Sequence, residues 1–203
     1  MFKNKYPGKF IAIEGIDGSG ATTQALRLKE YLAEKNIPFW LTQEPTDSVI
    51  GSIIKSHLSG NANIADHLGL QLLFAADRAN HLEQEIIPRL QKGETVISDR
   101  YFLSSIAYGS LNINDEDWLY QINDQFLLPD LTILIKVSAK IGIERISETR
   151  LSFNMFEQEE KLNKVWNNYE KIHKKYPNII IINGEKSIED TFQDVRAAIE
   201  KIL

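Results

Sequence analysis

The chain contains no cysteine, and this absence excludes several kinds of chemistry. Disulfide bonds, thiolate nucleophiles and cysteine-ligated metal centres all need a residue type that is not present. No long uncharged apolar run occurs, and no apolar signal region precedes the first predicted strand. We therefore expect a cytoplasmic protein that does not interact with membranes.

The chain has fewer basic than acidic residues. There are 23 Lys and Arg residues against 28 Asp and Glu, which gives a formal net charge of −5. A protein that binds nucleic acid usually has a basic surface, so the composition does not favour a nucleic-acid partner. The 203 residues are enough for one domain with a sizeable core, and we expect residues 1–203 to form a single domain.

A glycine-rich segment from Gly15 to Thr23 follows the apolar run Phe10–Ile13 and precedes a helical pattern. The spacing of its glycines and threonine fits the Walker A pattern of phosphate-binding loops. Glycines let backbone N–H groups approach an anion, and the start of the helix adds further donors. Seven residues are predicted to hold the phosphates of a nucleotide: Gly15, Gly18, Ser19, Gly20, Ala21, Thr22 and Thr23. The lysine of the pattern is missing, because Ala21 stands in its place.

Short apolar segments alternate with longer amphipathic ones, a pattern typical of parallel βαβ units. The predicted strands are Lys9–Glu14, Pro38–Gln43, Thr95–Asp99, Leu131–Val137 and Asn178–Ile182. The predicted helices are Gly20–Lys35, Ser48–Ser59, Ile64–Lys92, Asp115–Phe126, Ala139–Glu148, Phe156–Tyr176 and Ile188–Ile202. With the phosphate-binding loop, these elements predict an α/β three-layer sandwich of the P-loop NTPase type. Its centre would be a five-stranded parallel sheet flanked by helices.

Ligands of such sheets bind at the carboxyl ends of the strands. The predicted strand ends bring Gln43–Thr46 and Asp99–Tyr101 beside the phosphate-binding loop. There, Thr22 can ligate Mg²⁺, Asp99 can hold it through water, and Arg100 can bind a second phosphate.

A further segment, residues 149–155, is predicted to form a lid loop. Its Arg150 could neutralise charge on a phosphoryl group in transfer. Arg145 is expected on a solvated helix face, and His81 on the surface.

Taken together, these motifs resemble those of thymidylate kinase, over nearly the whole chain from Lys9. The segments that carry the resemblance are Ile13–Gly20, Glu44-Pro45, Leu73–Arg78, Ser98–Tyr108 and Leu128–Thr132. The resemblance implies phosphorylation of dTMP to dTDP with ATP and Mg²⁺, on a five-stranded parallel core, by a homodimer. The resemblance also implies that the nucleotide bound by the phosphate-binding loop is ATP.

The resemblance also implies roles for individual residues. Asp17 would bind the sugar 3′-hydroxyl, and Arg100 the monophosphate; with Arg150 they form the catalytic set. Phe74 would stack on thymine and Arg78 would bind a base carbonyl. Other acceptor-site residues are Glu44, Pro45, Tyr101 beside the sugar 2′ position, Ser105 and Tyr108. The metal would be held by Thr22, with support from Asp99 and Glu14.

The sequence departs from the pattern of the family at four positions. Ala21 replaces the lysine, Gln43 stands where an arginine is common, and Met155 falls where bacterial members often carry a lid arginine. All three changes remove positive charge near phosphates. Gly109 replaces a glutamine that frequently binds the base.

Three functions therefore remain open from the sequence. The first is an active dTMP kinase. The second is a catalytically weakened nucleotide-binding protein derived from the kinase, and the third is a kinase for another nucleoside monophosphate. The complete set Asp17, Phe74, Arg78 and Arg100 favours the first. Gly109 keeps the third open.

Overall fold

A parallel five-stranded sheet forms the centre of the molecule in the computed structural model, which describes residues 1–64, 66–147 and 155–203. Its strands are β2 (Phe10–Gly15), β3 (Phe39–Gln43), β4 (Thr95–Asp99), β6 (Leu131–Lys136) and β7 (Ile179–Asn183). They lie in the order β3-β4-β2-β6-β7, and every pairing is parallel. The predicted α/β class and the five strands are confirmed, with ends shifted by about a residue.

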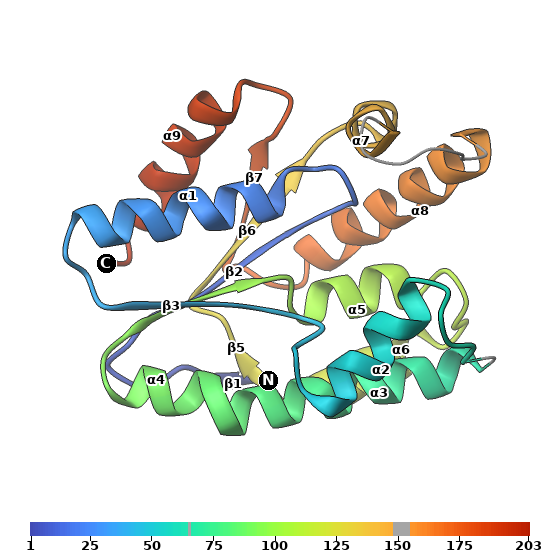
Figure 1. The fold of residues 1–203 in the computed structure, drawn as a ribbon, viewed down its shortest axis with the longest axis horizontal. Coiled ribbons are helices and arrows are strands. Elements are labelled where there is room, and N and C mark those ends of the chain that lie inside the picture. The colour runs from blue at the N-terminus through green and yellow to red at the C-terminus, as the bar shows by residue number, and fades with distance from the viewer. Residues whose placement is uncertain (65, 148–154) are drawn as a thin grey trace.

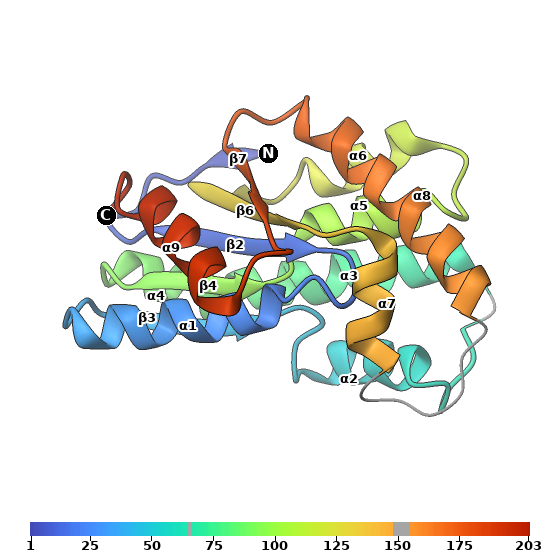
Figure 2. The ribbon, with the colours of Figure 1, turned by 90° about the horizontal axis from the view of Figure 1, so that it is seen from above.

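Helices cover both faces of the sheet (Figure 1). Helices α1 (Ala21–Glu34) and α9 (Ile188–Ile199) lie on one face. The other face carries α2 (Val49–Leu58), α3 (His67–His81), α4 (Ile87–Gln91), α5 (Phe102–Gly109) and α6 (Glu116–Asn123). Helices α7 (Ala139–Ser147) and α8 (Met155–His173) complete the fold beside the carboxyl end of β6 (Figure 2).

The alternation of side chains along β2 divides the core into two halves. Phe10 and Ala12 belong to the cluster shared with α5 and α8, whereas Ile11 and Ile13 belong to the cluster shared with α1 and α9. Successive side chains of a strand point to opposite faces, so a central strand must be apolar on both. This requirement explains why the sequence shows β2 as an unbroken apolar run.

Two parts of the fold differ from the prediction. The single helix expected over Ile64–Lys92 is divided into α3, a π-helical turn at Leu82–Ile86 and α4. Pro88 has no N–H to donate in the first turn of α4, which accounts for a change of hydrogen bonding there. Helix α5 was not predicted, because most of its residues are buried and its sequence therefore lacks an amphipathic period.

Two short strands, β1 (Phe2–Lys3) and β5 (Leu127–Leu128), also escaped prediction; they pair only with each other. Among the helices of the described ranges, none combines the length and apolar character that a bilayer span needs.

Candidate active site

The ends of β2, β3 and β4 meet at one edge of the sheet, as the sequence predicted. Two backbone hydrogen bonds continue the pairing past the strands. Glu44 N donates to Asp99 O at 3.0 Å, and Arg100 N donates to Ile13 O at 2.9 Å. The phosphate-binding loop, the Glu44-Pro45 segment and the Asp99-Arg100 turn are thereby held side by side. The Glu44-Pro45 peptide bond is cis.

The phosphate-binding loop runs from Gly15 to α1, and its shape depends on glycine. Gly18 and Gly20 have φ angles of 76° and 89°, in the left-handed region that glycine adopts without strain. A side chain on Gly18 would also overlap the backbone of Gly142 on α7. Ala21 begins α1 and is buried, so the helix starts where the loop ends.

Arg145 binds the outer side of this loop. Its guanidinium donates to Gly18 O at 3.4 Å, to Ser19 O at 3.3 Å and to Gly184 O at 2.9 Å. The expectation that Arg145 lies on a solvated helix face is therefore wrong, because α7 turns its last turn toward the loop. Arg145 also lines a cavity of about 230 Å³ beside the loop, together with Ser19, Gly20, Thr23, Gln24, Gly184, Lys186, Ile188 and Thr191.

Thr22 and Asp99 face each other across the start of α1. Thr22 Oγ1 donates to Asp99 Oδ2 at 2.6 Å. Asp99 Oδ1 is buried and has no partner among the described residues. Burial raises the pKa of Asp99, which the Thr22 hydrogen bond and the Arg100 charge partly offset.

A hydroxyl beside a carboxylate with one free oxygen is a donor set that suits Mg²⁺. In the described part of the chain no three His, Asp or Glu side chains gather to hold a metal by themselves. The ion would therefore need phosphate oxygens and water to complete its shell.

Arg100 sits at the centre of the edge with its backbone in the left-handed region, at φ 68°. Its Nη2 donates to Asp17 Oδ1 at 2.7 Å, and its Nη1 donates to Gly15 O and Ser104 Oγ, both at 3.1 Å. Tyr108 stands beside it, with its hydroxyl accepting from Asp17 N at 3.0 Å. Asp17, Arg100 and Tyr108 thus form one group next to the first glycine of the loop.

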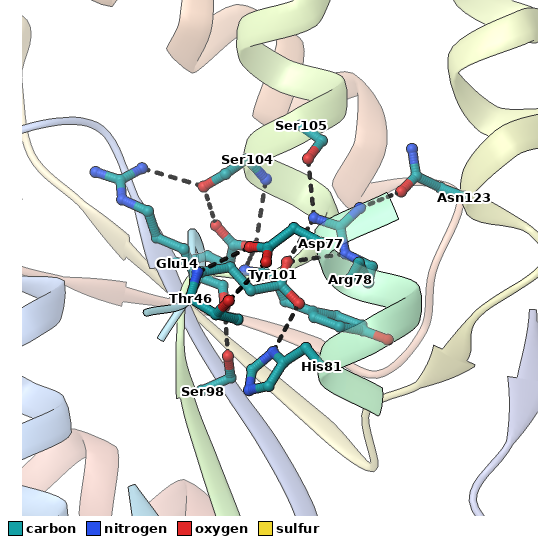
Figure 3. Close-up of polar contacts among 12 residues, drawn as sticks. Glu14, Thr46, Asp77, Arg78, His81, Ser98, Tyr101, Ser104, Ser105 and Asn123 are labelled. Carbon is teal, nitrogen blue, oxygen red and sulfur yellow. Dashed lines mark hydrogen bonds and ion pairs between the residues drawn. The ribbon is translucent and has the colours of Figure 1, made fainter. Parts of the chain in front are cut away.

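A buried carboxylate, Glu14, holds the turn that carries Arg100 (Figure 3). Its Oε1 accepts from Tyr101 N at 2.8 Å and from Ser104 N at 3.3 Å; its Oε2 accepts from Ser104 Oγ at 2.5 Å. The hydroxyl of Tyr169, from α8, donates to Oε2 at 3.2 Å. Both oxygens are engaged inside the protein, so these contacts do not support Glu14 as a metal ligand. Sequence reasoning missed the link between Tyr169 and this site.

Burial raises the pKa of Glu14 from 4.5 to about 7, although the Ser104 hydrogen bond and Arg100 lower it in part. The folded protein therefore binds more protons at Glu14 than the unfolded chain does between these two pH values. Stability contributed by this group must fall as pH rises from 4.5 to 7 and stay level above that range.

We expect the near-isosteric variant Glu14→Gln to lack this pH dependence. The wild-type free energy of unfolding, relative to that of the variant, should fall by about 3 kcal/mol between pH 4.5 and 7. Urea unfolding of both proteins at pH 5, 6, 7 and 8 measures the difference, in which the other titrating groups cancel. A constant difference over this range would contradict the raised pKa.

Arg78 on α3 is buried and paired with Glu44. Its Nε and Nη2 donate to Glu44 Oε2 at 2.9 and 2.7 Å, and Nη2 also donates to Ser105 Oγ at 2.9 Å (Figure 3). Nη1 donates to Asn123 Oδ1. A buried guanidinium needs this density of partners to offset the loss of water. Glu44 is thus a buried ion-pair partner that fixes Arg78.

His81 is buried as well, with 2 % of its surface exposed, so the expectation of a surface position is wrong. Its Nδ1 lies 3.1 Å from Glu44 Oε1, and its Nε2 lies 2.8 Å from Thr42 Oγ1. His81 lies one turn after Arg78 on the same face of α3, so both side chains reach the Glu44 carboxylate inside the protein.

The remaining predicted residues fall into three groups. Phe74 is half-buried on α3, whereas the Tyr101 hydroxyl is buried and donates to Leu127 O at 3.0 Å. Gln43 is exposed and lines a cavity of about 600 Å³ that also reaches Thr22 and Asp99. Arg150 and most of the lid predicted at 149–155 lie outside the described residues, which omit 148–154; Met155 is the first residue of α8.

Comparison with known proteins gives a consistent result. The family model described as thymidylate kinase matches residues 13–195. A probable thymidylate kinase of Pyrococcus horikoshii is 40 % identical over 201 residues, covering 97 % of this chain and 98 % of that protein. One from Thermococcus onnurineus is 39 % identical, covering 96 % and 98 %. The thymidylate kinase of Caldicellulosiruptor saccharolyticus is 34 % identical over 204 residues, covering 97 % and 98 %.

Proposed function

The chain belongs to the thymidylate kinase family, and from this premise we propose that it phosphorylates dTMP to dTDP, with ATP as the donor and Mg²⁺ as the metal. The observation that carries the proposal is the meeting of the phosphate-binding loop and Arg100 at one edge of the sheet. The loop would hold the phosphates of the donor, and Arg100, which donates to Asp17 and to Gly15 O, would hold the phosphate of the acceptor.

The reaction needs positioning and charge stabilisation more than a protein nucleophile. Backbone N–H groups from Gly15 to Thr23 and the start of α1 bind the phosphates of ATP. Thr22 and Asp99 would hold Mg²⁺, which when bound would neutralise negative charge on the phosphates of ATP. Arg100 binds the phosphate of dTMP, and Asp17 takes the 3′-hydroxyl. We propose direct in-line transfer from ATP to dTMP without a phospho-enzyme.

On the acceptor side, Phe74 would stack on the base and the Arg78 guanidinium would face a base carbonyl. Glu44, Pro45, Tyr101, Ser105 and Tyr108 would shape this pocket. The buried ion pair between Arg78 and Glu44 supports this assignment, because it holds the guanidinium in one orientation before substrate arrives.

On the donor side, the cavity of about 230 Å³ continues from Ser19 and Gly20 and has Arg145 as a wall. Its position next to the loop suits the nucleoside part of ATP, with the planar guanidinium available to stack on the base. Arg150 of the proposed lid, residues 149–155, would then act on the transferring phosphoryl group.

The direct test is formation of dTDP, followed by chromatography, with ATP or GTP as donor across a panel of nucleoside monophosphates. We expect dTMP to be the best acceptor. If another monophosphate is preferred, the assignment of the substrate is wrong. Nucleotide binding without turnover would instead favour the weakened binding protein, which the missing cations at Ala21 and Gln43 keep as the second candidate.

The absent lysine allows a sharper test. Two cations already contact the backbone of the loop, Arg100 at Gly15 O and Arg145 at Gly18 O and Ser19 O. Ala21 itself is 5 % exposed and packs in the core cluster beneath α1. We therefore expect Ala21→Lys to give no gain in turnover, because the new charge would repel the existing cations and disturb this packing.

The measurement is the steady-state rate of ADP release at saturating dTMP, with circular dichroism as the control for folding. Ala33→Lys, near the solvent-exposed end of α1, is a matched control for adding a charge to the same helix. A clear rise in turnover for Ala21→Lys alone would show that the site merely lacks its cation.

We also propose a homodimer. Exposed apolar side chains gather on α2 and α3, where Val49 is 81 %, Leu58 60 % and Leu72 47 % exposed; Ile53 and Leu68 add to them. Adjacent exposed apolar side chains of this size are typical of protein interfaces. Light scattering of the purified protein measures the state directly, and a monomer at all concentrations would contradict the proposal.

A further inference from the structure

Gln71 on α3 is a buried residue whose amide oxygen has no hydrogen-bond partner among the described residues. Only 6 % of its surface is exposed, yet its side chain makes no hydrogen bond with any described residue. Its Oε1 is among the few buried polar atoms without a partner in the described chain. Leaving such a group unpaired is unfavourable, so an unpaired amide at this depth needs an explanation.

Gly109 on α5 provides the space that this amide occupies. A Cβ atom on Gly109 would lie 3.0 Å from Gln71 Cδ and 3.1 Å from its Oε1. A side chain at residue 109 would therefore crowd the amide of Gln71, and also Leu119 Cδ2 at 3.1 Å. The glutamine that frequently follows Ala-Tyr in the family is absent at residue 109, and the amide of Gln71 from the neighbouring helix lies against this glycine.

The position of Gln71 brings it to the acceptor side. Residues 71, 74 and 78 share one face of α3, because they are spaced by three and four. Residues 105 and 109 share the facing side of α5, and Arg78 Nη2 donates to Ser105 Oγ across the seam between these helices. Gln71 and Gly109 form the next contact along the same seam, beyond the half-buried Phe74.

We propose that Gln71 is a specificity-determining residue that hydrogen-bonds the base of the acceptor. This inference rests on the proposed function and names the part of the base that the site recognises. A carboxamide offers one donor and one acceptor side by side, which matches the adjacent N–H and C=O groups of a thymine or uracil ring.

Arg78 determines which group of the base can lie beside it. Its four hydrogen bonds to Glu44, Ser105 and Asn123 leave one N–H of the guanidinium without a partner among the described residues. A guanidinium only donates, so it favours a base with a carbonyl at that place. Cytosine carries an amino group there, and the pair Gln71 and Arg78 would reject it.

The test compares Gln71→Met, which keeps the size of the side chain but removes the amide, with the wild type. We expect the KM for dTMP to rise about tenfold or more, the KM for ATP to stay unchanged, and the preference for dTMP over dCMP to fall by a similar factor. Gln193→Met, on the exposed face of α9, is the matched control and should change none of these values.

A second readout separates recognition from a structural role. Because Gln71→Met removes a buried unpaired amide, we expect the free enzyme to melt at the same or a higher temperature while dTMP binding weakens. A structural residue would lower the melting temperature and weaken all substrates alike.

The double variant Gln71→Ala/Gly109→Gln transfers the amide from α3 to α5, and we expect it to regain part of the preference for dTMP over dCMP. The inference is wrong if Gln71→Met leaves the KM for dTMP unchanged, or if the KM values for dTMP and dCMP rise equally. Failure of the wild type to form dTDP would instead overturn the proposed function, and it would be seen before any variant is made.

Discussion

Replacement of Arg100 by alanine is expected to lower kcat/KM for dTMP by about two orders of magnitude or more. Arg100 is held by Asp17, Gly15 O and Ser104 with its guanidinium at the site proposed for the acceptor phosphate. A hydrogen bond to a charged group contributes about 1.5–3 kcal/mol, and a guanidinium can make two of them to one phosphate. Each 1.4 kcal/mol is a factor of about ten in rate.

Arg145→Ala is the informative companion to this variant. Arg145 contacts the other side of the loop and lines the donor cavity, so its loss should raise the KM for ATP and leave the KM for dTMP near the wild-type value. Arg100→Ala should act mainly on dTMP. Arg196→Ala, at a half-exposed arginine of α9 paired with Glu200, should be neutral. If Arg100→Ala and Arg145→Ala raise both KM values equally, the division into donor and acceptor sides is wrong.

Local signals were sufficient for the sheet and for the residues at its edge. The strands of a parallel sheet are buried on both faces, so the interiors of β2, β4 and β6 are rich in Ile, Val and Leu. The carboxyl end of β4 then locates Asp99 and Arg100, and the spacing of the phosphate-binding loop locates Thr22, without any knowledge of side-chain contacts. The phosphate-binding loop can also be recognised from the sequence. Its glycines at Gly18 and Gly20 adopt positive φ angles, and such a spacing of glycines is uncommon.

Residues that join the site through packing could not be found in this way. Arg145 and His81 have the spacing of ordinary polar helix positions, and only the tertiary fold turns them toward Ser19 O and Glu44. Tyr169 looks like a core aromatic until α8 brings its hydroxyl to Glu14. Gln71 attracts attention only once the structure shows its side chain packed against Gly109, which has no side chain of its own. In each case the deciding contact joins residues that are distant in sequence or lie on different elements.

The second large effect is expected for Asp99→Asn, which keeps the shape of the side chain but removes its charge. Asp99 Oδ2 accepts from Thr22, and Oδ1 is buried without a partner in the described chain, so this carboxylate is free to support a metal. We expect kcat to fall by about a hundredfold or more at physiological Mg²⁺ concentration, since charge stabilisation by a metal amounts to several kcal/mol. Excess Mg²⁺ should restore part of the activity.

The melting temperature of the free enzyme should not fall in Asp99→Asn. Burial raises the pKa of the Asp99 carboxyl, which means that its negative charge is unfavourable in the folded protein. Thr22→Ala should show the same dependence on Mg²⁺, whereas Thr22→Ser, which retains the hydroxyl, should not. If the two residues act through one ion, the double variant Thr22→Ala/Asp99→Asn should lose much less than the product of the single losses. Full additivity, or an Asp99→Asn enzyme with the Mg²⁺ titration curve of the wild type, would separate Asp99 from the metal and leave Thr22 as the protein's ligand.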